Sequence, residues 1–351
     1  MAKDLKDTPK KLGYRFPAEW EKHEATWLSW PHNIETWPGD KLNNMMPAYI
    51  RFIEEICKGE KARINVRDER MKDDALRLME KMNVDASQVE FFFHPTNDSW
   101  CRDHGPAFLV NENREPRKAV VNWEYNAWGG KYPPFALDNQ VPARIAKALN
   151  LPAYSPGIVM EGGAVEFNGK GALLTTESCL LNKNRNPHLS KVEIERYLVE
   201  YYCVDEILWL GEGIAGDDTD GHIDDLTRFV NEDTVIAVYE EDKGDDNYEI
   251  LKTNIRRLNR MRLQNGKQLQ VVEIPLPKPL YSDGLRMPAS YANFYISNKS
   301  VVIPVYGDAN DQRAIETIGR FFPGRDVVGI DSTHIIWGLG SFHCLCQQEP
   351  A

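Results

Sequence analysis

The chain has little that would suit a membrane protein, an exported protein or a nucleic-acid-binding protein. No run of its 351 residues approaches the roughly 18 consecutive apolar residues of a membrane-spanning helix. Its first seven residues, MAKDLKD, hold no apolar segment of the kind that secretory signals contain. The net charge is −11 and the pI is ≈ 5.3, which makes a nucleic-acid phosphate backbone an unfavourable partner. We therefore expect a cytoplasmic protein that binds neither membrane nor nucleic acid.

Cysteine is also sparse, and its spacing indicates no disulfide framework. Six cysteines are scattered over the chain, and a reducing compartment would keep them as thiols. Linkers rich in Pro, Gly or Ser and low-complexity segments are missing as well. We expect a flexible N-terminal tail over residues 1–13 and a single catalytic domain over residues 14–351. The sequence leaves the oligomeric state open, and a homo-oligomer is compatible with it.

What the chain does have is a repeating order of strands and helices. A hairpin, a helix and a further strand recur roughly every 50–70 residues, a period that suggests a propeller-like or array architecture. The turn Asn168-Gly169 predicts one of the hairpins, and Ser190 with Glu193 predicts a capping box at the start of a helix. Apolar spacing predicts further helices over 44–57, 72–82, 141–149 and 311–322, and strands at 62–66, 89–93, 106–110, 119–125, 207–210, 227–230, 235–239, 269–274, 292–296, 301–305 and 327–330.

The C-terminal segment 337–348, WGLGSFHCLCQQ, departs from this pattern. Two glycines precede a His-Cys pair, and glycine accepts tight turns and lets other groups approach closely. A thiol on such a turn is a candidate nucleophile, because the thiolate is the reactive form and its surroundings set its pKa. A free cysteine is also commonly a small buried hydrophobe. Cys344 is therefore a candidate only if other segments supply its chemical partners.

Three other segments place polar residues beside glycines between apolar elements: 97–106, 160–163 and 217–225. Together with the C-terminal turn they supply one thiol, one imidazole and three carboxylates, on Cys344, His222, Asp103, Glu161 and Asp224. Carboxylates in this excess favour a cationic substrate. A guanidinium is planar and offers N–H donors in a fork that carboxylates bind in bidentate fashion. Its central carbon becomes open to attack by a thiolate once such partners hold the charge.

Other interpretations of the same residues stay open. Asp103 beside Arg102 is compatible with a structural ion pair, and the acidic loop around His222 with a solvated surface. His222 and Asp224, completed by a later histidine, fit a two-His-one-carboxylate iron site. His343, Cys344 and Cys346 are candidate zinc ligands, although the second short-spaced ligand pair of structural zinc sites is missing.

Taken together, the four segments resemble agmatine deiminases, which belong with the bacterial-type peptidylarginine deiminases in the guanidine-modifying superfamily. The resemblance covers nearly the whole chain. It rests on WCRD at 100–103 followed by Gly105-Pro106, EGG at 161–163, GHID at 221–224 and GSFHC at 340–344, with further support at 126–130 and 180–188. It implies an α/β fold, the five-bladed pseudo-symmetric propeller called the pentein fold.

The resemblance also implies a role for each site residue. Cys344 would be the nucleophile and His222 the general acid and base. Asp103 and Asp224 would clamp the guanidinium, while Glu161 would contact it and orient His222. The implied reaction passes through a covalent thiouronium on the cysteine and needs no metal and no cofactor.

The expected partner is a small cationic molecule, agmatine. Trp100 and Trp128 would enclose its methylene chain, unless they only pack in the core, and Gly340 would lie against the substrate. In relatives that act on peptidyl-arginine, the segment matching 125–132 carries arginines, whereas here it reads YNAWGGKY with Lys131 as its one basic residue. The alternatives are a deiminase of another guanidine, such as arginine or peptidyl-arginine, and an inactive member of the fold that binds polyamines.

Overall fold

The computed structural model describes residues 7–351. Within them, four sheets share one pattern, an antiparallel strand pair followed by a third strand parallel to the second. Their strands are β4 (Ala107–Val110), β5 (Lys118–Val121) and β6 (Ala153–Tyr154); β7 (Val165–Phe167), β8 (Ala172–Thr176) and β9 (Glu206–Leu210); β10 (Thr227–Phe229), β11 (Thr234–Tyr239) and β12 (Gln270–Pro275); and β15 (Tyr295–Ile296), β16 (Ser300–Val305) and β17 (Asp326–Asp331).

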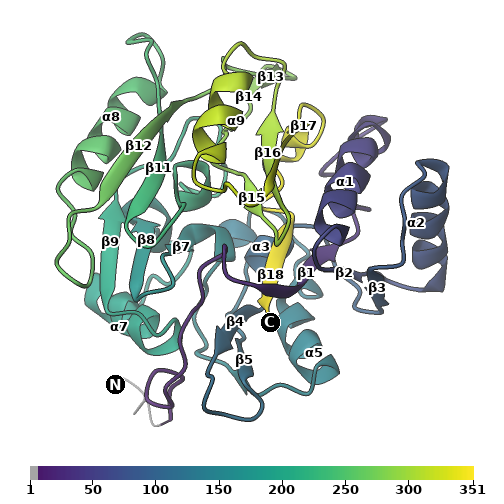
Figure 1. The fold of residues 1–351 in the computed structure, drawn as a ribbon, viewed down its shortest axis with the longest axis horizontal. Coiled ribbons are helices and arrows are strands. Elements are labelled where there is room, and N and C mark those ends of the chain that lie inside the picture. The colour runs from purple at the N-terminus through teal and green to yellow at the C-terminus, as the bar shows by residue number, and fades with distance from the viewer. Residues whose placement is uncertain (1–6) are drawn as a thin grey trace.

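A helix connects the second strand to the third in each sheet, so the predicted unit of hairpin, helix and strand is confirmed (Figure 1). In chain order these helices are α5 (Val141–Ala148), α7 (Lys191–Tyr201), α8 (Asn247–Leu258) and α9 (Asp311–Gly319). The capping box at the start of α7 is present, with Ser190 and Glu193 bonding reciprocally. The shorter elements are α3 (Cys101–His104), α4 (Ala127–Gly130), α6 (Glu177–Leu180), η1 (Asp138–Gln140), η2 (Gly162–Ala164), η3 (Ile223–Asp225), η4 (Ile336–Gly338), β13 (Tyr281–Ser282) and β14 (Leu285–Arg286).

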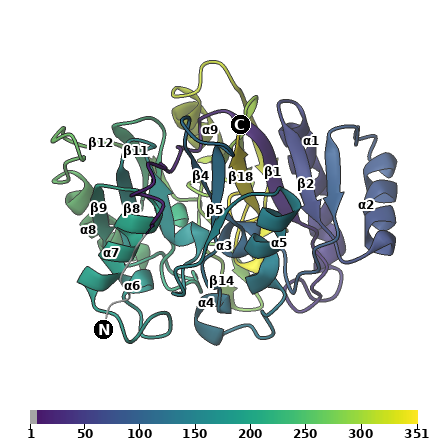
Figure 2. The same cartoon turned by 90° about the horizontal axis from the view of Figure 1, so that it is seen from below.

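The two ends of the chain build a fifth sheet of the same pattern. β18 (Cys346–Pro350) pairs antiparallel with β1 (His23–Ser29), and β1 pairs parallel with β2 (Lys61–Asn65) through the connecting helix α1 (Lys41–Cys57). α2 (Glu69–Lys81) then leads to the additional strand β3 (Val89–Phe92). Yellow β18 lies beside purple β1 in Figures 1 and 2. This pairing fixes the backbone directly after the predicted nucleophile within the interior.

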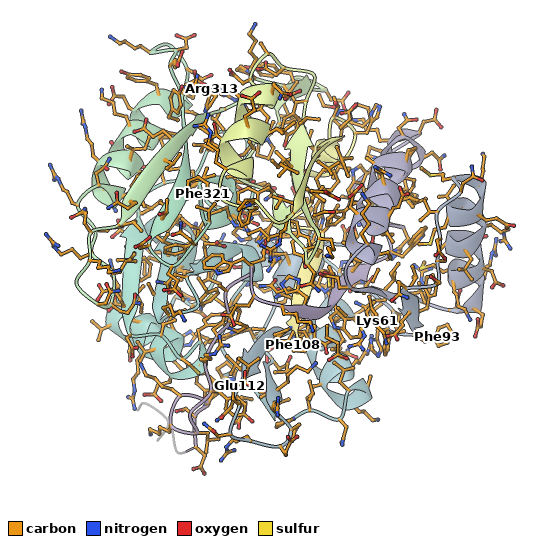
Figure 3. The ribbon with its side chains drawn as sticks, in the orientation of Figure 1. Lys61, Phe93, Phe108, Glu112, Arg313 and Phe321 are labelled. Atoms are coloured by element: carbon orange, nitrogen blue, oxygen red, sulfur yellow. The ribbon has the colours of Figure 1, made fainter. Side chains whose placement is uncertain are left out.

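The interior is apolar around these sheets. Trp27 of β1 is fully buried and packs against Phe92, with ring centroids 4.7 Å apart, so it belongs to the core rather than to a pocket wall. Phe108 of β4 is 1% exposed, whereas Phe93, directly after β3, is 49% exposed (Figure 3). None of the described helices combines the length and the apolar composition that crossing a bilayer requires.

Several expected boundaries differ in the structure by a few residues; the strand expected over 119–125, for example, ends at Val121. The predicted helix over 311–322 ends at Gly319, a residue type that weakens helices, and Phe322 instead turns inward and is buried. The predicted strand over 292–296 shrinks to Tyr295–Ile296, because Asn293 bonds to residues of the site rather than to a neighbouring strand.

The predicted N-terminal tail lies partly outside the described residues, which begin at residue 7. Residues 8–13 pack against the end of α7 and the residues after it. The Lys10 N–H donates to the carbonyl of Glu200 at 3.1 Å, and its ammonium donates to the carbonyl of Val204 at 2.5 Å and to Asp205 at 2.7 Å. This part of the predicted tail is therefore held in place rather than loose.

Candidate active site

Each of the five sheets receives its first strand from a polar segment, and these segments carry the predicted site residues. α3, η2 and η3 directly precede β4, β7 and β10, while Asn293 precedes β15 and Cys344 precedes β18. α3 contacts both η2 and β18, and η2 contacts η3. The repeat therefore brings one short segment per sheet to a common place, although these segments are far apart in the sequence.

Gly163 of η2 lies where three of the predicted residues meet. A Cβ atom at this position would lie 2.6 Å from His222 Nδ1, 2.8 Å from Asp103 Oδ1 and 3.1 Å from Asp224 Oδ2. The Gly163 N–H also donates to Asp103 Oδ1 at 2.9 Å. A residue without a side chain is needed here, because the backbone itself forms a wall of the site.

Asp103 is buried and held on both oxygens. In addition to the backbone bond from Gly163, its Oδ2 accepts from the Trp128 indole N–H at 3.0 Å. Burial raises the pKa of Asp103 to about 6; the nearby carboxylates of Asp224 and Glu161 also raise it, and His222 opposes them. The two bonds fix the direction of the carboxylate toward the pocket, which Asp103 lines.

His222 stands beside Asp103, with its Nδ1 3.7 Å from Asp103 Oδ1. Neither of its buried ring nitrogens has a hydrogen-bond partner among the described residues. Burial lowers the pKa of His222, but Asp103, Cys179 and Asp224 outweigh it and hold the pKa well above its ordinary value. The resting imidazole therefore carries a proton that no hydrogen bond in the described chain engages.

Asp224 is fixed from behind by His343, whose Nδ1 donates to Asp224 Oδ2 at 2.7 Å. The other nitrogen of His343 contacts Glu19 Oε2 at 2.9 Å, and the Arg228 guanidinium donates to Glu19 Oε1 at 2.9 Å. Burial raises the pKa of Asp224, but His343 and His222 overcome this effect and the net shift is downward. Its Oδ1 is buried without a hydrogen-bond partner within residues 7–351.

The thiol of Cys344 faces this carboxylate and is 5% exposed. It lies 3.5 Å from Asp224 Oδ2 and accepts from the Asn293 side-chain amide at 3.1 Å. Burial raises the pKa of the Cys344 thiol far above its usual range, and the charges of Asp224, Asp225 and Asp103 raise it further. The resting thiol is therefore neutral, and a bound cation is required to favour the thiolate.

A pocket of ≈ 920 Å³ opens onto this thiol. Five of the predicted residues line it: Cys344, Asp103, Trp100, Trp128 and Gly340. Seven Asp and Glu residues line it against three Lys and Arg residues. Burial raises the pKa of one of the seven, Asp138, to about 8, and the other six still outnumber the cations, which suits a cationic ligand. Gly340 packs against Trp100, since a Cβ there would lie 2.5 Å from its ring. His222, Glu161 and Asp224 lie behind the lining.

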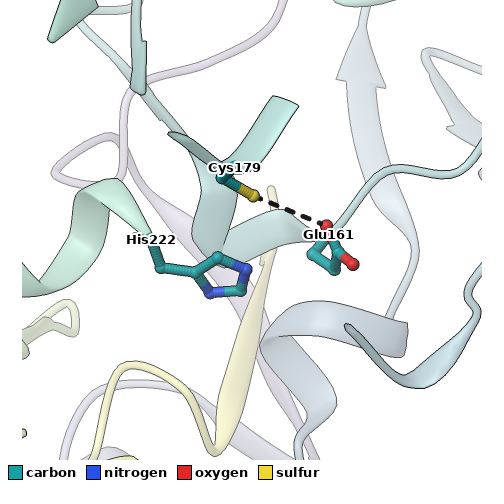
Figure 4. A group of neighbouring side chains, drawn as sticks. All are labelled: Glu161, Cys179 and His222. Atoms are coloured by element: carbon teal, nitrogen blue, oxygen red, sulfur yellow. Dashed lines mark hydrogen bonds between the residues drawn. The ribbon is translucent and has the colours of Figure 1, made fainter. Parts of the chain in front are cut away.

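Glu161 is engaged on its far side. Its Oε1 accepts from Arg185 Nε at 2.6 Å, and the same guanidinium bonds Asp220 at 2.7 Å. Its Oε2 lies 4.0 Å from the sulfur of Cys179, and both residues stand next to the ring of His222 (Figure 4). Glu161 is thus a neighbour of the imidazole, held in position by a fully buried arginine.

Several residues of this site had no role in the sequence-based prediction. Asn293, which contacts the thiol, gave one signal, a polar residue inside an apolar predicted strand. Asp225 accepts from the same amide at 3.0 Å and lies next to Asp224 in the predicted acidic segment. His343 was considered only as a zinc ligand with Cys346, whereas its ring contacts Asp224 and Glu19. Among the described residues, the group of three potential metal ligands is Glu161, Cys179 and His222, which is neither predicted metal set.

Comparison with known proteins gives the same family as the motifs. A profile of the Porphyromonas-type peptidyl-arginine deiminase family matches residues 15–350. The chain belongs to this family. Agmatine deiminase of Medicago truncatula is 34% identical over 378 residues, with 99% of each chain covered. Agmatine deiminase of Pseudomonas aeruginosa is 36% identical over 370 residues, with 98% of this chain and 97% of the relative covered.

Solved structures of deiminases also share the fold. Agmatine deiminase of Enterococcus faecalis superposes with a TM-score of 0.90 at 32% identity, covering 100% of this chain and 99% of that one. A C. jejuni agmatine deiminase with a cysteine-to-serine substitution and bound substrate superposes with a TM-score of 0.85 at 31% identity, covering 96% of each chain. The resemblance drawn from the four motifs is therefore confirmed, and the fold is mixed α/β, as in these enzymes.

Proposed function

We propose that this member of the deiminase family is an agmatine deiminase, an enzyme that hydrolyses agmatine to N-carbamoylputrescine and ammonia. One observation carries the proposal. The Cys344 thiol lies 3.5 Å from Asp224, and Cys344 lines an acidic pocket together with Asp103. A guanidinium placed there meets a carboxylate on either side and a sulfur atom in reach of its central carbon.

The first half of the reaction forms a bond between sulfur and carbon. The cationic substrate lowers the pKa of the Cys344 thiol, whose proton leaves to solvent, and the thiolate attacks the guanidinium carbon. Asp103 and Asp224 hold the guanidinium nitrogens and keep the charge localised. The protonated His222 then gives its proton to the departing nitrogen, the C–N bond breaks, and ammonia leaves a thiouronium on Cys344.

In the second half of the reaction, water hydrolyses the thiouronium and frees Cys344. The now neutral His222 takes a proton from water while the hydroxide forms a bond to the thiouronium carbon. The C–S bond then breaks, Cys344 leaves as a thiolate, and the carbonyl of the ureido product forms as its oxygen loses its proton to solvent. His222 ends the cycle protonated, which matches the upward shift of its pKa in the resting site.

The remaining residues position the participants. Glu161, fixed by Arg185, orients His222 and contacts the guanidinium. Trp128 fixes Asp103 through its indole N–H and, with Trp100, provides apolar ring surface for the methylene chain. Gly340, which has no side chain, lets the Trp100 ring lie close to the backbone beside Cys344.

Charge supports agmatine over substrates that carry a carboxylate. Lys131 lines the pocket, but its ammonium is engaged by Asp218 at 3.2 Å and by Asp220 at 3.0 Å. Lys41 also lines it and pairs with Asp283 at 2.7 Å. Arg67 stands exposed on the lining. Arginine or peptidyl-arginine would have to compete with these aspartates for the ammonium of Lys131 or Lys41.

The repeated sheet pattern supports a further structural proposal, that the five sheets are blades of a pseudo-symmetric propeller, the pentein fold, within one catalytic domain. Each sheet contributes the segment before its first strand to the site, so a common axis near the site would explain why segments of all five units come together. Superposition of the five sheets by successive rotations about that axis tests this arrangement.

Ammonia release tests the function. The purified protein should release ammonia from agmatine, with N-carbamoylputrescine as the second product, and should act more slowly on arginine, a peptidyl-arginine and methylated arginines. Cys344→Ala should abolish the reaction, while Cys346→Ala, at a buried thiol two residues away, should leave it measurable. Turnover that survives Cys344→Ala would refute the covalent route. Agmatine binding without turnover in the wild type would favour an inactive polyamine-binding protein instead.

A further inference from the structure

Behind the catalytic imidazole lies a second thiol that has no step in the proposed reaction. Cys179 of α6 is fully buried, and its sulfur is 4.0 Å from Glu161 Oε2 (Figure 4). One ligand atom each of Glu161, Cys179 and His222 lie within 4.8 Å of one another. The three residues come from three separate segments, before η2, in α6 and before η3. A carboxylate, a thiol and an imidazole therefore converge in the interior.

The atoms that face this cluster are available for a ligand. Both ring nitrogens of His222 lack hydrogen-bond partners in the described part of the chain, although both are buried. Arg185 Nε donates to Oε1 of Glu161 at 2.6 Å, and the other oxygen, Oε2, lies on the side of Cys179. Buried polar atoms without partners are uncommon, so a ring nitrogen of His222 beside Glu161 and Cys179 is a candidate ligand atom.

We propose that Glu161, Cys179 and His222 bind a zinc ion, and that this ion inhibits the enzyme. Carboxylate, thiolate and imidazole are the ligands zinc takes in proteins, and three protein ligands with one open position is a common arrangement for it. Tetrahedral zinc with bonds of about 2.0–2.3 Å separates its ligand atoms by roughly 3.3–3.8 Å. The side chains need to draw together by up to about 1.5 Å to reach that geometry from the present one.

The charges of the cluster suit a divalent cation. The Glu161 carboxylate and a Cys179 thiolate together balance Zn²⁺, once the thiol proton is released on binding. The neighbouring Arg185 keeps its own partner, Asp220, at 2.7 Å, so it adds no unpaired positive charge. The ion and its ligands together would carry no net charge, and the buried residues around them would shield the ion from solvent.

Inhibition follows from the shared histidine. A neutral His222 that binds zinc through one ring nitrogen is no longer the imidazolium that can protonate departing ammonia, and its other nitrogen carries the N–H, so no free lone pair is left to take a proton from water. This consequence rests on the proposed function, whereas zinc binding itself does not. The site differs from any site built on Cys344, because its sulfur ligand is a residue the reaction does not use.

A direct measurement of zinc binding distinguishes a site that uses Cys179 from one that uses Cys344. Full-length Cys344→Ser protein removes the nucleophile, and calorimetry with zinc chloride should still show one tightly bound ion per chain. Cys179→Ser in that background should weaken binding at least ~10-fold. Cys203→Ser, at a partly exposed thiol outside the cluster, is the matched control and should bind zinc unchanged. Cobalt titration should show a thiolate-to-metal absorption band that disappears with Cys179→Ser.

Activity provides the second readout. Zinc should inhibit wild-type turnover, a chelator should restore it, and the turnover that Cys179→Ser keeps should be at least ~10-fold less sensitive to zinc. Zinc affinity that is lost with Cys344→Ser alone, or unchanged by Cys179→Ser, would overturn the proposal. If zinc binds as described but no guanidine is hydrolysed, the proposed function fails and the metal site stands.

Discussion

Replacing Gly163 with alanine inserts one methyl group between three polar groups of the site. The added Cβ would lie 2.6 Å from His222 Nδ1 and 2.8 Å from Asp103 Oδ1, where ordinary contacts begin at 3.4 Å. The imidazole and the carboxylate must therefore move apart by up to ~0.8 Å, a displacement at which misplaced catalytic groups lose on the order of 10²-fold in rate. We expect Gly163→Ala to lower kcat/KM by about 10²-fold, or about 2.7 kcal/mol of transition-state stabilisation.

The effect on stability should be smaller than the effect on activity. Overpacking a well-filled interior costs about 1–3 kcal/mol, so the variant should still fold. Initial rates of ammonia release measure the activity, and urea unfolding measures the stability. Gly324→Ala is the matched control, because a Cβ there meets nothing within 4 Å. A folded Gly163→Ala enzyme with wild-type activity would refute the close packing of His222 and Asp103 around this glycine.

Three further substitutions test individual contacts. His343→Phe removes the donor to Asp224 at 2.7 Å and should lower kcat by roughly 10-fold or more, as measured by steady-state kinetics, because a hydrogen bond to a charged group is lost. Trp128→Phe removes the donor to Asp103 at 3.0 Å. Burial raises the pKa of Asp103 to about 6, so kcat/KM should decrease as the pH is lowered through about 6. Loss of the indole donor should move this decrease to higher pH, because the donor favours the charged carboxylate. A pH profile that does not move would contradict the role of the indole. Burial raises the pKa of Asp138 to about 8, above its value in the unfolded chain, so its protonated form favours folding and that contribution is lost as pH rises from about 4 to 8. Asp138→Asn should therefore remove up to about 1.4 kcal/mol per pH unit from the slope of unfolding free energy against pH, measured by urea titration.

Much of the local structure could be predicted because its causes are local. The turn at Asn168-Gly169 gives the hairpin in which Phe167 pairs with Leu173, and Ser190 gives the capping box. The site segments could also be found, because each places polar residues and glycine directly before a strand. Their order along the chain then reproduces the order of the sheets that carry them.

The partners of the site residues could not be predicted in the same way. Glu19 reaches His343 from 324 positions away, and only the pairing of β1 with β18 brings the two ends of the chain together. Asn293 lies in an apolar run that favours a strand, and its contact with Cys344 depends on the packing of a different sheet. The reason for the second glycine of the EGG motif appears only when three side chains from other segments surround it.

The most direct test is the mass of the protein during turnover. Acid quenching of wild-type enzyme with excess agmatine, followed by intact-mass and peptide-mass measurement, should show an adduct equal to agmatine less ammonia on the peptide that carries Cys344. The adduct should disappear as substrate is consumed. Steady turnover with no adduct at any quench time, or an adduct on another cysteine, would contradict the assignment of Cys344 as the nucleophile.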